Sequence, residues 1–173
     1  MATGLLVIDL QRGMFMDAAK PHDGEGVLSR VASLLERARR SGTPVLHVQH
    51  DGGSGDPLAK PGPGFEIRPE VAPRPGEPVI EKSVCSAFPG TDLDAQLKRL
   101  GITRLVIAGM QTEYCIDTNC RVATDLGYKV VLAGDGHTTF DSPVLSAAQI
   151  IAHHNRVLGS GFVELAAAED IKF

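Results

Sequence analysis

Short apolar runs alternate with helical patterns along the whole chain, and this alternation constrains the fold more than any other feature. The apolar runs predict strands at 5–8, 44–48, 78–81, 104–108, 129–133 and 162–165. Helical spacing of apolar residues predicts helices at 27–40, 91–100, 112–126 and 142–158. Several strand segments are continuously apolar, as in sheets whose two faces are both covered. We therefore predict a three-layer, Rossmann-like α/β/α sandwich around a mostly parallel six-stranded sheet.

The length and charge of the chain narrow its class. A length of 173 residues predicts one domain, spanning 1–173, that can bury a real core. The net charge of −4 argues against nucleic acid or an anionic membrane surface as the main partner. No apolar run approaches the roughly 20 residues of a membrane span, and no signal peptide is recognisable. Three cysteines without a C-x-x-C pair predict reduced thiols in the cytoplasm and no structural zinc site.

Three reactive side chains fall at the carboxyl ends of predicted strands. Asp9 ends the first strand, Lys82 follows the third, and Cys115 lies just after the fourth, in the first turn of the next helix. Taken singly, these residues are more simply a turn residue, a solvated lysine and a buried thiol. Parallel strands bring their carboxyl ends to one edge, where ligands bind in such folds. We therefore expect the three side chains to form one site.

A cysteine in that position indicates nucleophilic catalysis. Unpaired N–H groups of a helix's first turn and a nearby Lys82 ammonium both favour a thiolate, so we expect the pKa of Cys115 to be lowered. Asp9 is placed to take the thiol proton and later hand it to a leaving amine. Backbone amides of the turn at 109–115 are candidates for an oxyanion hole. These features predict hydrolysis of a small amide-like substrate.

Four segments around these residues carry a family resemblance. They read LVIDLQ at 6–11, EKSVCSAF at 81–88, AGMQTEYCI at 108–116 and AGDGH at 133–137. They resemble, in order, the opening strand with the catalytic Asp, the catalytic Lys segment, the nucleophile loop and the segment after the fifth strand of the isochorismatase-like cysteine hydrolase superfamily. That superfamily includes nicotinamidases and N-carbamoylsarcosine amidohydrolases. The resemblance covers nearly the whole chain.

The resemblance implies a role for each matched residue. Cys115 would attack the carbonyl and form a thioester, Asp9 would act as base and then as acid, and Lys82 would orient the pair and stabilise charge. The family's nucleophile loop carries a cis peptide bond, which here falls at Met110–Gln111. That bond would aim the Gln111 N–H, together with the N–H of Cys115, at the oxyanion. Family members are usually homo-oligomers, so a dimer or tetramer is expected.

Departures from subfamily patterns limit the substrate. Nicotinamidases carry a metal-binding Asp-x-His segment after the second strand, but the corresponding stretch at 49–52 reads QHDG. We therefore expect no metal or other cofactor, and we do not expect nicotinamide as the substrate. His47 and His50 lie on opposite faces of a strand, which also argues against joint metal binding. Isochorismatases proper cleave a vinyl ether by acid catalysis without the cysteine. Cys115 therefore favours C–N hydrolysis. The alternatives are a vinyl-ether hydrolase using Asp9 as acid and a non-catalytic protein using Cys115 as a redox switch or ligand anchor.

Residues beside the matched segments are candidates for binding the substrate. They are Gln11, Phe15, Phe88, Tyr114 and His137. The aromatic residues fit a core position equally well, and a structural role suits His137. The loop at 51–78, rich in Gly and Pro, is expected to shape specificity.

Overall fold

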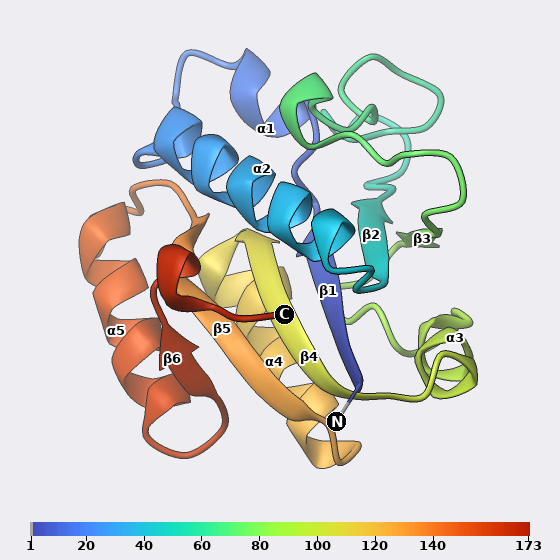
Figure 1. Cartoon of the computed structure of the whole chain (residues 1–173). Helices are drawn as coiled ribbons and strands as arrows, with labels where there is room; N and C mark the ends of the chain where they lie inside the picture. Colours follow the sequence, from blue (N-terminus) through green and yellow to red (C-terminus); the bar gives the residue numbers. More distant parts are fainter. Residues whose placement is uncertain (1) are drawn as a thin grey trace.

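Six parallel strands form a single sheet in the computed structural model, which describes residues 2–173 (Figure 1). The strand order is β3-β2-β1-β4-β5-β6, and every neighbouring pair is parallel. The strands are β1 (Ala2–Ile8), β2 (Val45–His50), β3 (Val79–Lys82), β4 (Ile102–Met110), β5 (Lys129–Thr138) and β6 (Glu164–Ala166). The predicted six-stranded, mostly parallel sheet is confirmed.

Helices cover both faces of this sheet. The four longer ones are α2 (Gly24–Arg40), α3 (Leu93–Arg99), α4 (Asp117–Asp125) and α5 (Ala147–Gly159). Figure 1 shows α2 in front of the sheet and α4 behind it. The short pieces are α1 (Gly13–Met16), η1 (Pro69–Val71), η2 (Thr112–Ile116), which is π-helical, and η3 (Ala168–Asp170). The three-layer prediction is therefore also confirmed.

Strand β1 shows why the sheet lies between two cores. Successive side chains of a strand point to opposite faces. Leu6 and Ile8 join the core under α3 and α4, whereas Leu5 and Val7 join the core under α2. All four side chains are buried. Each such burial contributes about 1.5–3 kcal/mol, so a strand that is apolar on both faces is stable only at the centre of the sandwich.

The order of the strands places a crevice at the centre of the sheet. From β1 the chain builds outward through β2 and β3, and then returns to place β4 on the other side of β1. Ligands bind in such folds beyond the carboxyl ends of the strands at this point of reversal. Asp9 directly follows β1, and Gln111 directly follows β4.

The helix predicted at 142–158 begins later than expected, at Ala147. Ser146 caps it: the Ser146 side chain accepts a hydrogen bond from the Gln149 N–H, and the Gln149 side chain accepts one from the Ser146 N–H. Ser142 instead closes a turn, in which its hydroxyl accepts a hydrogen bond from the Leu145 N–H. The predicted start was wrong because Ser142–Pro143 imitates a helix start, whereas only Ser146 has a Gln three residues later.

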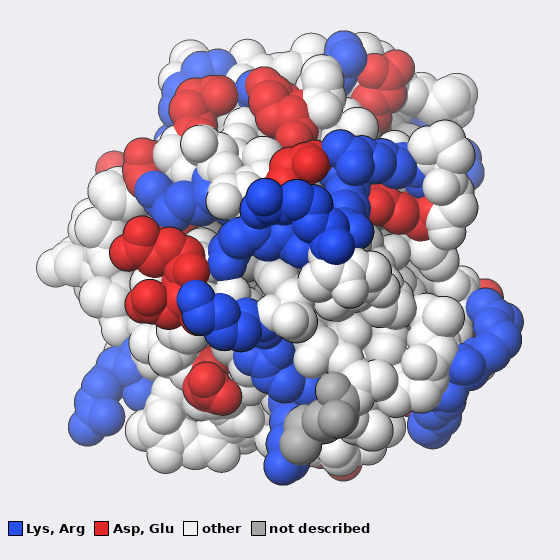
Figure 2. Space-filling view, viewed as in Figure 1, with Lys and Arg blue, Asp and Glu red and all other residues white. Residues whose placement is uncertain are grey.

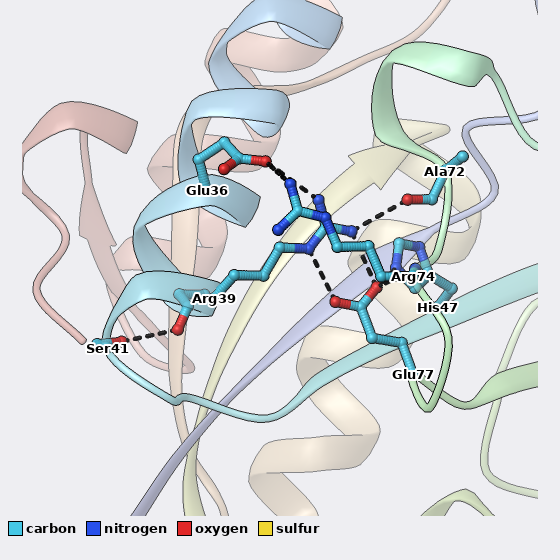
Figure 3. Close-up of polar contacts among 8 residues, drawn as sticks. Glu36, Arg39, Ser41, His47, Ala72, Arg74 and Glu77 are labelled. Atoms are coloured by element: carbon cyan, nitrogen blue, oxygen red, sulfur yellow. Dashed lines mark hydrogen bonds and ion pairs between the residues drawn. The ribbon is translucent and has the colours of Figure 1, made fainter.

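Basic and acidic side chains are mixed on the face covered by α2 (Figure 2). The last turn of α2 supplies Arg37 and Arg39 to this face. Arg37 donates a hydrogen bond to the Ile171 carbonyl at 2.7 Å and so fastens the C-terminal segment to α2. Arg39 binds the Glu77 carboxylate at 2.8 Å (Figure 3). These arginines are therefore occupied by contacts within the chain. Within residues 2–173, none of the helices combines the length and the apolar character that crossing a membrane requires.

Candidate active site

Asp9, Lys82 and Cys115 meet at the carboxyl edge of the sheet. The Lys82 Nζ atom lies 2.7 Å from Asp9 Oδ2 and 3.2 Å from Cys115 Sγ. The side chains of Asp9 and Lys82 are fully buried, and Cys115 is 8% exposed. The structure thus brings together three residues that are far apart in the sequence.

Asp9 and Cys115 line a cavity of about 370 Å³. Its walls come from α1, from the long loop between β2 and β3, and from the segment that follows β4. Met14, Leu58 and Phe140 supply apolar surface, and none of the lining residues is a lysine or an arginine. This volume suits a small molecule with a few polar groups that fix its orientation.

Asp9 is held in an unusual state. Its backbone has a φ of +52°, a left-handed conformation that Asp tolerates better than most residues. The Lys82 ammonium contacts Oδ2 at 2.7 Å as an ion pair, whereas Oδ1 has no hydrogen-bond partner within residues 2–173. Burial raises the pKa of Asp9, and the charge of Lys82 offsets part of this effect. A carboxylate with a raised pKa and free lone pairs is suited to accept a proton.

Cys115 lies in a π-helical turn rather than in the first turn of an α-helix. The N–H groups of Tyr114 and Ile116 both donate to the Gln111 carbonyl, at 3.2 and 3.1 Å. The Asn119 side chain donates to the Cys115 carbonyl at 2.7 Å. Short π-helical segments occur frequently at functional sites. This turn carries the thiol to the cavity before α4 begins.

The pKa of Cys115 is raised well above that of an ordinary thiol, so the expectation of a lowered pKa was wrong. Burial is the largest cause, and the negative charge of Asp9 adds to it. Lys82 acts in the opposite direction but does not outweigh both effects. The resting site therefore holds a neutral thiol, and its proton must move when the sulfur attacks.

A close approach of β4 to β1 shapes the floor of the cavity. A Cβ atom at Gly109 would lie 2.0 Å from the Ile8 carbonyl oxygen, and Gly109 has a φ of +134°, so only glycine fits. The Met110–Gln111 peptide bond that follows is cis. Gln111 and Cys115 both line the cavity.

His50 is a site residue that the sequence interpretation missed. It is the last residue of β2, pairs in register with Lys82 of β3, and lines the cavity. Its Nδ1 atom lies 3.1 Å from Lys82 Nζ. The sequence interpretation considered His50 only as half of a metal pair. The rule that located Asp9 and Lys82, a polar residue at a strand's carboxyl end, applies to it equally.

Only Tyr114, among the five residues expected to bind substrate, lines the cavity, and it is 54% exposed. Gln11 is fully buried, and its amide donates to the carbonyls of His50 and Phe65, both at 2.9 Å. It therefore fastens the long loop to β2 and does not face the cavity. No local pattern reveals this role, because both partners lie about forty residues or more along the chain.

The other three candidates also lie outside the cavity lining. Phe15 and Phe88 are buried in the two cores. His137 is buried, and its ring nitrogens contact Thr112 Oγ1 and Asn155 Oδ1, both at 2.8 Å. Burial lowers the pKa of His137 to about 4, so the ring is neutral. The two aromatic residues thus occupy the core positions that the sequence left open, and His137 braces the turn that carries Cys115.

The described chain, residues 2–173, contains no group of three or more His, Cys, Asp or Glu side chains arranged to hold a metal ion. His47 points away from His50 and contacts Glu77, with 3.1 Å between Nε2 and Oε2. All three cysteines are free.

Comparison with known proteins assigns the family. The family model described as the isochorismatase domain matches residues 3–153. A streptothricin hydrolase of Streptomyces noursei is 39% identical over 80% of this chain and 50% of its own length. The ureidoacrylate amidohydrolase RutB of Variovorax paradoxus is 26% identical over 86% of this chain and 73% of its own length. The chain spans about half the length of the two streptothricin hydrolases that it matches.

The fold comparison agrees. A solved isochorismatase of Pseudomonas putida superposes with a TM-score of 0.93 at 31% identity, covering 98% of this chain and 89% of that one. The family model matches most of the chain, and the superposition extends over nearly all of it. The chain therefore belongs to the isochorismatase family.

Proposed function

We propose that the protein is a cysteine-dependent hydrolase that cleaves the C–N bond of a small amide-like molecule through a thioester. The observation that carries this proposal is the position of Lys82 Nζ, 2.7 Å from Asp9 and 3.2 Å from the Cys115 sulfur at the edge of a cavity. An acid–base group, a cation and a nucleophile within hydrogen-bonding reach are the parts that covalent catalysis requires.

The first half of the reaction forms the thioester. As the Cys115 sulfur attacks the amide carbon, its proton passes to Asp9, and the carbonyl oxygen becomes negatively charged. The N–H groups of Gln111 and Cys115 hold this oxyanion, an interaction whose loss typically lowers the rate about 100- to 1000-fold. The C–N bond then breaks, Asp9 returns the proton to the departing nitrogen, and an amine or ammonia leaves.

The second half releases the acid. A water molecule enters where the amine left. Asp9 takes a proton from this water as the water oxygen attacks the thioester carbon. The C–S bond breaks, the proton returns to the sulfur, and the carboxylic acid leaves. The buried Lys82 ammonium stays close to both partners throughout and balances the charge that moves between them.

The comparisons support this class of chemistry without naming the substrate. Two relatives carry the names of hydrolases, and one of these is an amidohydrolase. The substrates in their names, streptothricin and ureidoacrylate, are those of the relatives and not of this protein. The proposed partner is a small-molecule substrate, and neither nucleic acid nor a membrane is proposed as a partner. The three free cysteines fit the proposed reducing cytoplasm.

A vinyl-ether hydrolase is the second candidate, and the raised pKa of Asp9 favours it, because a protonated carboxyl can serve as the acid of that reaction. Replacement of Cys115 separates the two. We expect Cys115→Ala to abolish ammonia release from a panel of small amides and to remove an acyl adduct detectable on the intact protein by mass spectrometry. Full activity of Cys115→Ala would rule out the thioester. Cys120→Ala, which removes a buried thiol outside the cavity lining, is the matched control and should keep turnover.

A further inference from the structure

The buried Lys82 ammonium has as many acceptors as it has protons. Its three N–H groups face Asp9 Oδ2 at 2.7 Å, His50 Nδ1 at 3.1 Å and Cys115 Sγ at 3.2 Å. The Lys82 side chain is fully buried, so none of these contacts can be replaced by bulk water. A buried N–H that loses its acceptor is strongly unfavourable, more so on a charged group. His50 is therefore one of three fixed points that define where the ammonium sits.

The Lys82 contact also decides which ring nitrogen of His50 carries the proton. An ammonium has only donors, so His50 Nδ1 must present its lone pair, and the proton of the neutral ring is on Nε2. Burial and the charge of Lys82 lower the pKa of His50, whereas the carboxylates of Asp9, Asp56 and Asp51 raise it. The lowering effects win, and the ring is neutral at neutral pH.

The backbone of His50 is locked from its other side by Gln11. The Gln11 side chain donates to the His50 carbonyl at 2.9 Å and accepts from the His50 N–H at 2.8 Å. Gln11 is fully buried and also holds the Phe65 carbonyl at 2.9 Å. Gln11 thus fixes the backbone position from which the His50 ring reaches Lys82.

We propose that His50 positions the Lys82 ammonium through Nδ1 and presents its Nε2–H to a hydrogen-bond acceptor of the substrate near the scissile bond. Its Nε2 makes no hydrogen bond within residues 2–173, and His50 lines the cavity beside Asp9 and Cys115. The inference rests on the proposed amide hydrolysis. It narrows the substrate to amides that carry a further acceptor, an oxygen or an unprotonated ring nitrogen, close to the reacting carbonyl.

The tautomer provides a test that needs no substrate. Nitrogen-15 spectra of protein labelled in its histidine rings distinguish the two neutral tautomers and the charged ring, and the His50 signals are assigned by their loss in His50→Asn. We expect the Nε2–H tautomer, with a midpoint of titration below the ordinary value of 6.5. An Nδ1–H tautomer, or a ring that is charged at pH 6.5, would overturn the positioning role.

Two substitutions then separate positioning from substrate binding. His50→Ala removes both nitrogens, so we expect kcat to fall about tenfold or more and the pH profile of Cys115 alkylation by iodoacetamide to shift. In His50→Asn, the side-chain oxygen takes the place of Nδ1, so the alkylation profile and most of kcat should return while KM rises. His153→Asn, on the exposed face of α5, is the control and should leave kcat, KM and the alkylation profile unchanged.

The possible failures can be told apart. A wild-type protein that cleaves no amide contradicts the proposed function, while the spectra and the alkylation profiles still decide whether His50 holds Lys82. If His50→Ala keeps the wild-type kcat and alkylation profile, the positioning role is wrong although the enzyme stands. If His50→Asn keeps the wild-type KM, the hydrogen bond from Nε2 to the substrate is wrong.

Discussion

Asp9 and Cys115 are coupled through charge, and this coupling makes a test with two opposite outcomes. After burial, the carboxylate of Asp9 is the largest cause of the raised pKa of Cys115. Asp9→Asn removes that charge and leaves Lys82 in place, so the pKa of the thiol should fall. We expect iodoacetamide to alkylate Cys115 faster at neutral pH, while amide turnover drops about 100-fold or more for want of a proton acceptor. Parallel measurements of alkylation and ammonia release from pH 6 to 9 give both quantities.

The control for this experiment is Asp125→Asn, which removes an exposed carboxylate at the end of α4 and should alter neither rate. A slower alkylation in Asp9→Asn would show that the carboxylate does not hold the thiol neutral. That result would leave the mechanism without its resting state.

Sequence reasoning located reactive residues better than it described their states. The ends of β1, β3 and β4 were enough to bring Asp9, Lys82 and Cys115 to one edge, because parallel strands share that edge by geometry. The predicted direction of the Cys115 pKa shift was wrong. The shift depends on burial and on the distance to Asp9, and local sequence patterns contain neither. Gln11 was misplaced for a similar reason, since its partners, His50 and Phe65, come from distant segments.

At the scale of elements, one ion-pair network ties the loop that walls the cavity to the rest of the fold (Figure 3). The Glu77 carboxylate, near the end of that loop, accepts from Arg39 at 2.8 and 2.9 Å and from the Arg74 N–H at 2.8 Å. It also contacts His47 of β2 at 3.1 Å. The Arg74 side chain also forms an ion pair with Glu36 of α2, at 2.5 Å. The network thus joins α2, β2 and the long loop.

This network predicts a loss of stability in acid. Burial alone would raise the pKa of Glu77, but hydrogen bonds from Arg39, the Arg74 N–H and His47, together with the charge of Arg39, lower it from 4.5 to about 2. A lowered pKa stabilises the fold above the unfolded value, and this contribution disappears as the pH falls from about 4.5 to about 2. A shift of this size corresponds to about 3 kcal/mol.

We therefore expect Glu77→Gln to lower the free energy of unfolding by about 3 kcal/mol at pH 7 and to flatten its dependence on pH below 4.5. Urea unfolding at a series of pH values measures both effects. Glu66→Gln breaks an exposed ion pair with Arg12 and should change stability by less than about 1 kcal/mol. Equal acid slopes in the wild type and Glu77→Gln would contradict the assigned role.

The start of α5 shows what local sequence can and cannot decide about an element. Both Ser142 and Ser146 are residues that cap helices, and the reciprocal bonds with Gln149 select Ser146. We expect Ser146→Ala to reduce stability by about 1 kcal/mol in thermal or urea unfolding. Ser160→Ala, which removes an exposed hydroxyl beyond the other end of the helix, should have a smaller effect. If the two substitutions are equal, the capping box does not stabilise the helix.

At the scale of the whole molecule, large exposed apolar side chains occur in segments that border the cavity. Met16, Val84, Tyr114 and Val144 are 60, 51, 54 and 86% exposed. Tyr114 lines the cavity itself, and the other three lie within four residues of the lining residues Met14, Cys85 and Phe140. Monomeric proteins seldom leave large apolar surface uncovered in one region. This exposure supports the homo-oligomer that the family resemblance implies.

We expect light scattering at micromolar concentration to give at least twice the mass of one chain. Val144→Asp should weaken the association, because a subunit contact would have to bury an unpaired carboxylate. Leu126→Asp, at an exposed position where α4 ends, lies outside the cavity-bordering segments and should leave the mass unchanged. A single-chain mass at every concentration would mean that the cavity is complete within one subunit. In that event the ring of Tyr114 would face solvent where it lines the cavity, and its apolar surface would be available to the substrate.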